Sequence, residues 1–308
     1  MKSLKVLVSD SIADGAVEEM RKAGLDVTVK TGLKPEAVCE IIPPFDVIVV
    51  RSATKVTDKV IEAANNLKLI VRAGVGLDNV NVEAAKKRNI RVENTPHATT
   101  ITVAEHVFAL LLSLARRIPQ ANASLQRGEW DRKSFQGTEL KGKTIGIVGL
   151  GRIGQEVAKR AKAFGMRVEA HDQIINPEVA DELEIKLKSL EEVVSQSDII
   201  SIHLPLTPET RHLFNLNLLK KMKKGAYLIN AARGGIVDEE ALVEILQSGH
   251  LAGAAIDVFE KEPPSPDHPL LKMKQVVAVA HLGAMTNEGQ IRAGIEAAHI
   301  IIEFAKHG

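Results

Sequence analysis

A glycine-rich turn at residues 149–154 constrains the fold of this chain more than any other feature. The turn reads Gly-Leu-Gly-Arg-Ile-Gly, follows the apolar run 144–148 and precedes a helix-like stretch over 155–164. In a strand–turn–helix unit, such glycines permit the tight turn, the approach of a pyrophosphate and close helix–strand packing. The bare pattern also occurs in ordinary turns, so its context carries the argument. We expect a dinucleotide site formed by Gly149, Gly151, Arg152, Ile153 and Gly154.

An acidic residue stands where such a site requires one. Asp172 ends the next apolar run, 166–171, about 20 residues beyond the glycines. Its carboxylate is placed to accept hydrogen bonds from both ribose hydroxyls, and its charge repels a 2′-phosphate. The sequence therefore predicts NAD as the cofactor, in preference to NADP.

Composition excludes several other classes of protein. The 308 residues are enough for two domains, and the formal net charge of +1 without a basic cluster argues against nucleic-acid binding. The longest apolar stretch, 103–115, is interrupted by Glu105 and His106 and is too short to span a bilayer, so it predicts a buried helix and no membrane partner. The single cysteine, Cys39, is interpreted as a small buried residue and suits a cytoplasmic location.

Short Val/Ile-rich runs alternate with amphipathic segments on both sides of the glycine turn. This rhythm indicates βαβ units, and hence an α/β fold with two Rossmann-like domains built on parallel sheets. The first domain is expected to end near Pro96, before a helix over 102–116 that Pro119 helps to end.

The last segment, 287–306, is expected to be a helix. It carries Ile291, Ile295, Ala298 and Ile302 at helical spacing, with Thr286 as its cap. If it returns to the first domain, the nucleotide domain is an insertion. The expected boundaries are a flavodoxin-like substrate domain over 1–96 and 283–308, and an NAD-binding domain over 97–282.

Polar residues follow two neighbouring strands of the first domain. Arg51 and Ser52 follow the run 46–50, and Arg72 follows 69–71 just before a turn that contains Gly74. Ligands of open α/β sheets bind at the carboxyl ends of strands, and two guanidinium groups suit a small anion with several charges. The alternative is that each arginine is a solvated charge at a strand end.

In the second domain, strand ends supply His203, Arg233, Asp257 and His281. His281, at the last of these strand ends, can take the proton of a secondary alcohol that loses a hydride. Glu262, in a proline-bounded loop, is the expected partner that fixes the His281 tautomer, and Arg233 is expected to hold a carboxylate. The alternative for His281 alone is a capped strand-end histidine without a catalytic role.

These residues resemble the D-isomer-specific 2-hydroxyacid dehydrogenases from about Val6 to Phe304. The motifs that carry the resemblance are Ala-Arg-Gly-Gly at 232–235, Asp-Val-Phe-Glu-Lys-Glu-Pro at 257–263 and His-Leu-Gly at 281–283. The resemblance implies Arg233, Glu262 and His281 as the catalytic set. It also implies a nucleotide domain in the middle of the chain and homodimers built on that domain, with tetramers as a further possibility.

Further motifs at 50–57, 72–80 and 137–140 narrow the resemblance to family members that act on a phosphorylated substrate. The implied reaction is NAD-dependent oxidation of D-3-phosphoglycerate to 3-phosphohydroxypyruvate, toward serine. The resemblance implies that the substrate contacts Arg51, Ser52, Arg72, Gly74 and, from a second subunit, Arg132. The cofactor contacts that it implies beyond the glycine turn and Asp172 are Val75, His203, Leu204, Pro205, Ala231, Ala232, Asp257, Gly283 and Ala284.

The chain departs from the family pattern at three positions. Val75 and Leu204 replace threonines that many relatives carry, and Met285 replaces a serine, which implies fewer hydroxyl contacts. The sequence ends at Gly308, so we expect a short form without the regulatory domain that binds serine in longer relatives. The alternatives are a glyoxylate or hydroxypyruvate reductase and, from a different class, an NAD-sensing corepressor. Glu262 argues against a formate dehydrogenase, whose histidine pairs with glutamine.

Overall fold

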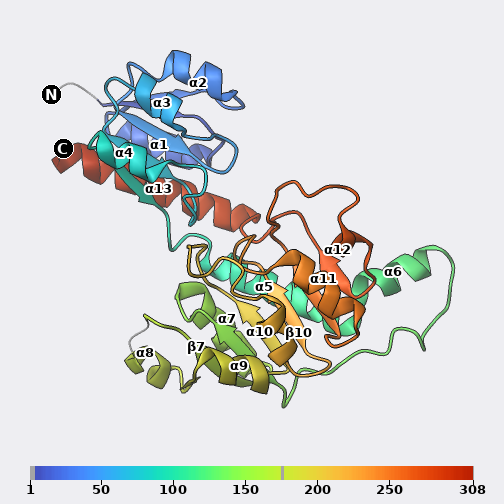
Figure 1. Cartoon of the computed structure of the whole chain (residues 1–308). Helices are drawn as coiled ribbons and strands as arrows, with labels where there is room; N and C mark the ends of the chain where they lie inside the picture. The colour runs from blue at the N-terminus through green and yellow to red at the C-terminus, as the bar shows by residue number, and fades with distance from the viewer. Residues whose placement is uncertain (1–3, 175–176, 308) are drawn as a thin grey trace. The chain divides into compact units, whose positions relative to one another are not determined.

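A computed structural model describes residues 4–174 and 177–307 of the chain. It divides into two compact units, one of residues 1–100 and 284–308 and the other of residues 101–283. The second unit is thus inserted in the first (Figure 1). The sequence-based boundaries at 96 and 283 lie close to these. Within the described ranges, no helix is both long and apolar enough to cross a membrane.

The first unit is built on a five-stranded parallel sheet in the order β2-β1-β3-β4-β5, the flavodoxin-like order. Its strands are short and mostly buried: β1 (Lys5–Val8), β2 (Asp26–Val29), β3 (Val47–Val50), β4 (Leu69–Arg72) and β5 (Arg91–Asn94). Its helices are α1 (Asp14–Lys22), α2 (Pro35–Ile41), α3 (Asp58–Ala63), α4 (Val82–Lys87) and α13 (Asn287–His307).

Both faces of this sheet are covered because side chains alternate along each strand. In β1, Val6 and Val8 pack with α1 and α13, whereas Leu7 packs with α2, α3 and α4 on the opposite face. Thr286 caps α13 as expected, since its Oγ1 accepts the Gly289 N–H at 3.0 Å.

The second unit has a seven-stranded parallel sheet in the order β12-β11-β10-β9-β6-β7-β8. Its strands are β6 (Thr144–Val148), β7 (Arg167–His171), β8 (Lys186–Leu187), β9 (Ile199–Ile202), β10 (Tyr227–Asn230), β11 (Gly253–Ile256) and β12 (Val276–Ala278). The order reverses beside β6, which places the glycine turn at the topological switch point where ligands of such sheets bind. The expected fold class, two Rossmann-like units with parallel sheets, is confirmed.

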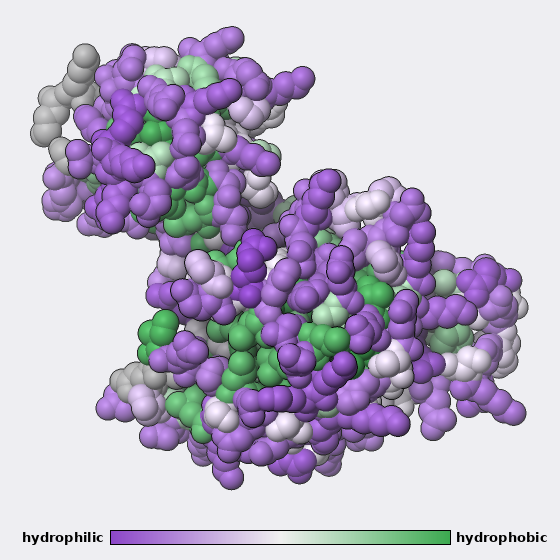
Figure 2. All heavy atoms as spheres, in the orientation of Figure 1, coloured by the Kyte–Doolittle hydropathy of each residue, from purple (hydrophilic) through white to green (hydrophobic). Residues whose placement is uncertain are grey.

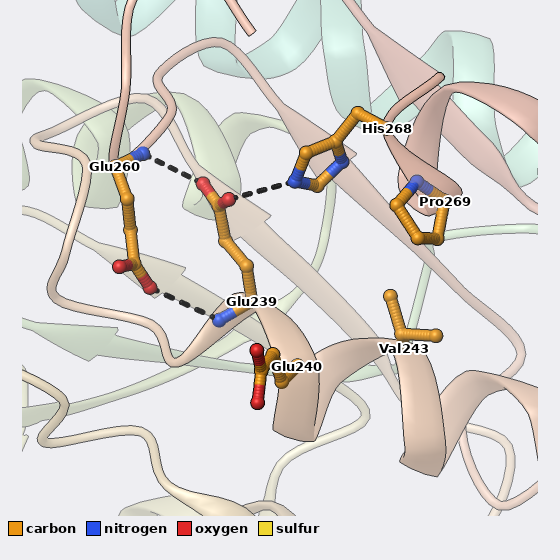
Figure 3. A pocket seen from close by; sticks show the side chains of 6 residues that line it. All are labelled: Glu239, Glu240, Val243, Glu260, His268 and Pro269. Atoms are coloured by element: carbon orange, nitrogen blue, oxygen red, sulfur yellow. Dashed lines mark hydrogen bonds and ion pairs between the residues drawn. The ribbon is translucent and has the colours of Figure 1, made fainter. Parts of the chain in front are cut away.

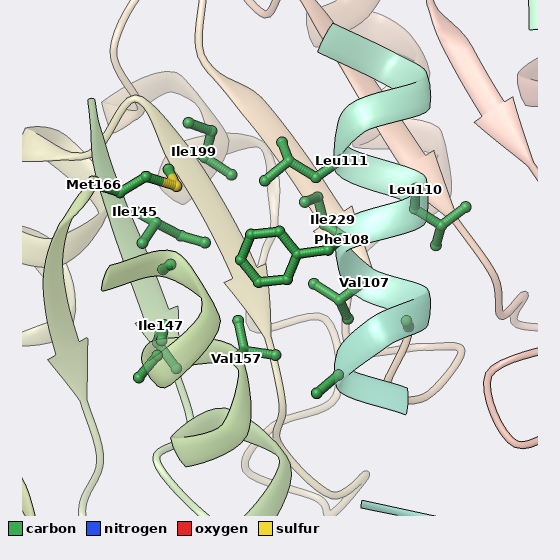
Figure 4. Packing of buried hydrophobic residues seen from close by; sticks show 14 of the residues in the cluster. Val107, Phe108, Leu110, Leu111, Ile145, Ile147, Val157, Met166, Ile199 and Ile229 are labelled. Carbon is green, nitrogen blue, oxygen red and sulfur yellow. The ribbon is translucent and has the colours of Figure 1, made fainter. Parts of the chain in front are cut away.

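Two layers of helices enclose the second sheet. The helices of this unit are α5 (Thr100–Arg116), α6 (Ile118–Gln126), α7 (Arg152–Ala163), α8 (Pro177–Glu182), α9 (Leu190–Gln196), α10 (Leu216–Lys221), α11 (Glu239–Gln247) and α12 (Pro269–Lys272). The layer drawn in Figure 4 packs α5 and α7 against strand residues such as Ile145, Ile147 and Ile229. The other layer packs Val193, Leu242 and Leu270 against the opposite face.

Hydrophilic side chains cover most of the face drawn in Figure 2, and apolar residues show between them as smaller patches. This distribution follows from the two-sided burial of both sheets, which turns the apolar faces of the helices inward.

Several local expectations need correction. Pro119 begins α6 rather than ending α5, which stops at Arg116 before a left-handed Arg117. Cys39 is half-buried, not fully buried. In α13 Ala298 is buried as expected, but Ile291 is 53% exposed, because the helix turns a narrow face of small residues such as Ala293 and Ala297 toward the sheet. These differences leave the fold class unchanged.

Candidate active site

The glycine turn has the geometry of a phosphate cradle. Gly149 has a positive φ of 100°, and a Cβ on Gly154 would lie 2.2 Å from the Gly149 carbonyl oxygen, so both positions require glycine. A Cβ on Gly151, by contrast, would point into open space. Gly151 is the N-cap of α7 and has no side chain that could satisfy the first N–H groups of the helix. The positive end of the helix is therefore left to an anion, while Arg152 is exposed and Ile153 half-buried beside it.

Asp172 follows β7 and holds the glycine turn. Its Oδ2 accepts the Leu150 N–H at 2.6 Å, and its Oδ1 accepts the Ile174 N–H at 2.8 Å. The carboxylate is thus oriented by the backbone on both sides. Asp172 thus follows β7, the second strand of this unit, where a carboxylate is suited to recognise a ribose.

The loop after β9 contains His203, Leu204 and Pro205. A Cβ on Gly149 would lie 2.7 Å from the His203 carbonyl oxygen, so this loop adjoins the glycine turn. The His203 Nε2 lies 2.9 Å from Ser201 Oγ. Burial lowers the pKa of His203 to about 4, so its imidazole is neutral at physiological pH. A neutral, side-chain-bonded histidine fits a structural or cofactor-facing position better than proton transfer.

Arg233 projects from a turn after β10 that Asn230 organises. The Asn230 Nδ2 donates to the Arg233 carbonyl at 3.0 Å, and its Oδ1 accepts the Ala232 N–H at 3.1 Å. Arg233 Nη1 donates to the Ala232 carbonyl at 2.6 Å. The turn begins at the buried Ala231. A folded-back guanidinium held by its own turn is positioned at the carboxyl end of the sheet.

Gly234 lets this turn approach another loop. A Cβ on Gly234 would lie 1.8 Å from the Phe259 carbonyl oxygen and 2.9 Å from the Glu260 nitrogen. Any larger residue would push the turn away from the loop over 257–263. The Arg233 turn and the loop that carries Glu262 are therefore packed backbone to backbone.

His281 and Glu262 form the pair that the sequence predicts. The His281 Nδ1 lies 2.8 Å from Glu262 Oε2, and Glu262 Oε1 accepts the Phe259 N–H at 3.1 Å. Both side chains are exposed, so the opposite ring nitrogen of His281 is available to a ligand. His281 has a positive φ of 53°, an uncommon conformation for a non-glycine residue, and it lies three residues beyond the end of β12 rather than directly after it.

Asp257 holds the segment that follows His281. The aspartate is 1% exposed, and its two oxygens accept the N–H groups of Leu282 at 2.6 Å and Gly283 at 2.9 Å. His106 Nε2 lies 3.3 Å from Asp257 Oδ1. Burial by itself raises the pKa of Asp257, but His106 and the two backbone donors outweigh it, so the pKa lies below its ordinary value. Asp257 is therefore an anion that positions the backbone beside His281.

In the first unit, a buried carboxylate organises the loop after β3. Asp10 accepts the Arg51 N–H at 2.6 Å and the Thr54 N–H and hydroxyl at 3.1 and 2.7 Å. Asn79 Nδ2 donates to the carbonyls of Arg51 and Thr54. Arg51 Nη1 donates to the Ser11 carbonyl at 3.1 Å. The loop is thus fixed from two sides, with Arg51 half-buried and Ser52 exposed.

Arg72 is the last residue of β4 and pairs in register with Val50, directly before Arg51. Its guanidinium lies over Gly74, where a Cβ would meet Arg72 Nη1 at 1.5 Å. Asn94 Nδ2 donates to the Val75 carbonyl at 2.5 Å and holds the turn that contains Gly74. The two arginines therefore lie at the ends of adjacent strands. Glycine at position 74 leaves the space that the Arg72 guanidinium occupies.

Two further predicted site residues lie in loops. Arg132 is exposed in the segment after α6, and Ala284 is half-buried where the chain re-enters the first unit. In the described part of the chain, no group of three or more His, Cys, Asp or Glu side chains is arranged to hold a metal ion.

Comparison with known proteins identifies the family. The model of the D-isomer specific 2-hydroxyacid dehydrogenase NAD binding domain matches residues 108–283, more than half of the chain. The chain belongs to the D-isomer specific 2-hydroxyacid dehydrogenase family. The resemblance inferred from the three motifs is thereby confirmed, and the matched range falls in the unit that contains the glycine turn.

Individual members of this dehydrogenase family resemble the chain over nearly its whole length. A D-3-phosphoglycerate dehydrogenase of Archaeoglobus fulgidus is 50% identical over 303 residues, which are 98% of this chain and 58% of that protein. The chain spans little more than half the length of such curated relatives. A crystal structure of a protein from Thermus thermophilus has a TM-score of 0.87 at 40% identity and covers 96% of this chain and 94% of its own. A glyoxylate reductase from Paecilomyes thermophila has a TM-score of 0.89 at 31% identity, with 99% and 96% covered.

Several residues that shape the site were not singled out from the dehydrogenase sequence. Asp10 and His106 carried no motif signal, and Asn79 stood in the motif at 72–80 without an assigned role, because their partners are backbone groups or lie far away in sequence. Glu239 and Glu260, which are 21 residues apart in sequence, each accept the backbone N–H of the other. A polar residue directly after a strand was a usable signal for Asp10, which stands two residues beyond β1.

Proposed function

We propose that the chain catalyses NAD-dependent oxidation of D-3-phosphoglycerate to 3-phosphohydroxypyruvate. The observation that carries this proposal is the His281–Glu262 pair at 2.8 Å, on a loop that also adjoins the Arg233 turn. Oxidation of a secondary alcohol needs a base for the hydroxyl proton and a cation for the neighbouring carboxylate. The Arg233 turn packs against the 257–263 loop, and Glu262 of that loop pairs with His281.

His281 acts as the base in this proposal. Its Nδ1–H donates to Glu262 Oε2, which leaves the Nε2 lone pair to accept the hydroxyl proton of the substrate. The bond to Phe259 keeps Glu262 from rotating away. The carboxylate then stabilises the imidazolium that forms, as in other carboxylate–histidine pairs.

The glycine turn, Asp172 and the loop over 203–205 are the residues that would hold NAD. The fit rests on the uncapped α7 N-terminus, on the open space beside Gly151 and on the backbone-held carboxylate of Asp172. When bound, NAD accepts the hydride that leaves C2 of the substrate. Arg233 orients the substrate carboxylate toward this transfer.

We assign the phosphate of the substrate to the arginines of the first unit. Arg51 and Arg72 end adjacent strands, and the loop of Arg51 is fixed by Asp10 and Asn79, so its cation is presented by a rigid backbone. Guanidinium groups bind phosphate oxygens through two parallel hydrogen bonds. A reductase acting on an unphosphorylated acid has no need of two such groups.

A comparison of substrates tests the assignment. Steady-state kcat/KM is measured with NAD for D-3-phosphoglycerate and for D-glycerate, and in the reverse direction with NADH for hydroxypyruvate and glyoxylate. We expect D-3-phosphoglycerate to be favoured at least tenfold over D-glycerate, since charged hydrogen bonds to phosphate contribute about 1.5–3 kcal/mol each. Equal values for the two acids would exclude a phosphate site and favour the glyoxylate reductase alternative.

We further propose that the chain forms a homodimer through its second unit. Ile118 and Leu125 on α6 are exposed, and Trp130 beyond it is 81% exposed. Apolar side chains grouped on one helix and its following loop are typical of an interface. Sedimentation of the wild type and of Trp130→Ser tests this: a monomeric wild type would exclude the dimer.

A further inference from the structure

A pocket of about 300 Å³ lies beside α11 and is lined in part by Glu260 of the 257–263 loop (Figure 3). It is lined by Glu239, Glu240, Val243, Glu260, His268 and Pro269. Three of these residues are acidic, yet two of the carboxylates are already engaged with protein groups. The pocket is therefore better explained by what its carboxylates hold than by a ligand.

Glu239 and Glu260 bind each other's backbone. The Glu260 N–H donates to Glu239 Oε1 at 2.7 Å, and the Glu239 N–H donates to Glu260 Oε1 at 3.3 Å (Figure 3). The second oxygen of Glu239 lies 2.9 Å from His268 Nε2. The Glu239 side chain is only 15% exposed, so this arrangement is held away from bulk solvent.

Two histidines and a helix N-terminus lie beside this pair of carboxylates. His268 faces Glu239, and His212 Nε2 lies 3.0 Å from Glu260 Oε1. Glu239 is also the first residue of α11, where the helix dipole favours a negative charge. The ring of His268 contacts Phe259 edge to face, with centroids 5.7 Å apart.

The peptide between Phe259 and Glu260 links this cluster to both parts of the proposed catalytic set. Its N–H is held by Glu239, and its carbonyl lies against Gly234, the neighbour of Arg233. The N–H of Phe259 in turn holds Glu262, the partner of His281. A shift of this one peptide therefore moves the Arg233 turn and the Glu262 carboxylate together.

We propose that Glu239, oriented by His268, is a positioning residue that fixes the 259–260 peptide and thereby the alignment of Glu262 with His281. This inference rests on the proposed function, in which His281 is the base. It assigns no contact between Glu239 and substrate or cofactor. Misplacement of catalytic groups by a fraction of an ångström is enough to lower turnover strongly.

Three variants test the proposal in the full chain. Glu239→Ala removes both acceptors, and Glu239→Gln keeps an oxygen for the Glu260 N–H while losing the second carboxylate oxygen beside His268. Glu240→Ala is the matched control, because Glu240 lies on the same turn of α11, lines the same pocket and is exposed. For each we measure kcat, KM, the dissociation constant of NADH and the pH at which the acidic limb of kcat/KM falls.

We expect Glu239→Ala to lower kcat about tenfold with an NADH dissociation constant within about twofold of the wild type. Its acidic limb should move to lower pH, because His281 loses an aligned carboxylate. Glu239→Gln should recover part of the loss, and Glu240→Ala should match the wild type. A Glu239→Ala enzyme with unchanged kcat and pH profile, whatever its melting temperature, would overturn the proposal.

A measurement without turnover separates this inference from the proposed function. The ring nitrogens of His281 are followed by NMR in ¹⁵N-histidine protein, assigned with His281→Gln. Under the proposal, the His281 ring titrates at lower pH in the Glu239→Ala and Glu262→Gln variants than in the wild type. In the Glu240→Ala variant it titrates as in the wild type. An unaltered His281 ring in Glu239→Ala rejects the positioning role, whereas a wild type that oxidises no hydroxy acid rejects the function alone. If Glu239→Ala does not fold, Glu239→Gln gives the same two decisive readouts.

Discussion

In each of the two units a buried aspartate holds the loop after a neighbouring strand, but the side chains on the two loops differ. In the first, Asp10 stands beyond β1, is 5% exposed and accepts backbone N–H groups from the loop after the paired strand β3. In the second, Asp257 stands beyond β11, is 1% exposed and accepts N–H groups from the segment after the paired strand β12. In both units, a buried carboxylate accepts hydrogen bonds from the loop that carries a residue of the proposed site.

The presented side chains differ in chemistry. The first unit presents Arg51, whose guanidinium stays protonated and so can bind an anion without exchanging protons. The second presents His281, whose imidazole can accept and release a proton and is paired with Glu262. Under the proposed function, the same arrangement of a buried carboxylate and a held loop serves substrate binding in one unit and proton transfer in the other. The following predictions test that division.

Replacing the base should have the largest effect. His281→Gln is expected to lower kcat by about 10²–10⁴, the usual contribution of a general base, with NADH affinity nearly unchanged. Stopped-flow and steady-state assays measure the first quantity, and NADH fluorescence titration measures the second. A His281→Gln variant that retains most of its kcat would contradict the assignment of proton transfer to the second unit.

Replacing the anion-binding group should affect KM more than kcat. Arg51→Ala is expected to raise KM for D-3-phosphoglycerate about 10- to 100-fold, from the loss of charged hydrogen bonds. Lys55→Ala, an exposed lysine on the same loop, is the control and should change KM little. A fall in kcat at constant KM would mean that the first unit also takes part in the chemical step.

The pH dependence of stability should show that His203 in the second unit is neutral in the folded protein. Because the pKa of His203 falls to about 4 on folding, its neutral form stabilises the fold above the unfolded pKa of 6.5. That stabilisation is lost as the pH falls from 6.5 toward 4. Urea unfolding at pH 7 and 4.5 should show a loss larger by roughly 2–3 kcal/mol in the wild type than in His203→Gln. Equal losses would show that His203 is protonated in the folded protein.

Removing one oxygen from each bracing carboxylate should have a smaller effect. Asp10→Asn and Asp257→Asn each leave one donor without its acceptor, which costs about 1–2 kcal/mol in the free energy of unfolding. Chemical denaturation of the two variants measures both values. Asp10→Asn should also raise KM, and Asp257→Asn should lower kcat. The reverse pattern would contradict the assignment of binding to one loop and catalysis to the other.

Sequence patterns were sufficient where the interaction is local. Gly149 and Gly154 belong to a turn whose shape depends on residues a few positions apart, and the structure gives them the expected close contact. The alternation of apolar runs likewise predicted two parallel sheets, because it records burial on both faces. The pairing of His281 with Glu262 was expected from a histidine near a strand end and a glutamate in a proline-bounded loop, the family motifs imply it as well, and the structure brings these residues together.

The sequence did not predict which backbone groups of distant elements a side chain would contact. Asp10 and Asp257 act on N–H groups 41 to 44 and 25 to 26 residues away, which no periodicity reveals. The exposure of Ile291 could not be predicted either, because helical spacing defines a stripe but not which edge of it faces the sheet. The end of β12 at Ala278 depends on pairing with β11, so the sequence placed His281 closer to a strand end than it lies.

The sequence by itself determined the class of fold, the dinucleotide turn and the family, since each depends on residue order over short spans. Only the tertiary structure decided which groups hold the functional loops in place. Asp10, Asp257 and Glu239 gained their roles when strand order and helix packing brought distant backbone amides to their carboxylates. Such contacts follow from the path of the chain in space, because a backbone N–H group carries no residue-specific signal in the sequence.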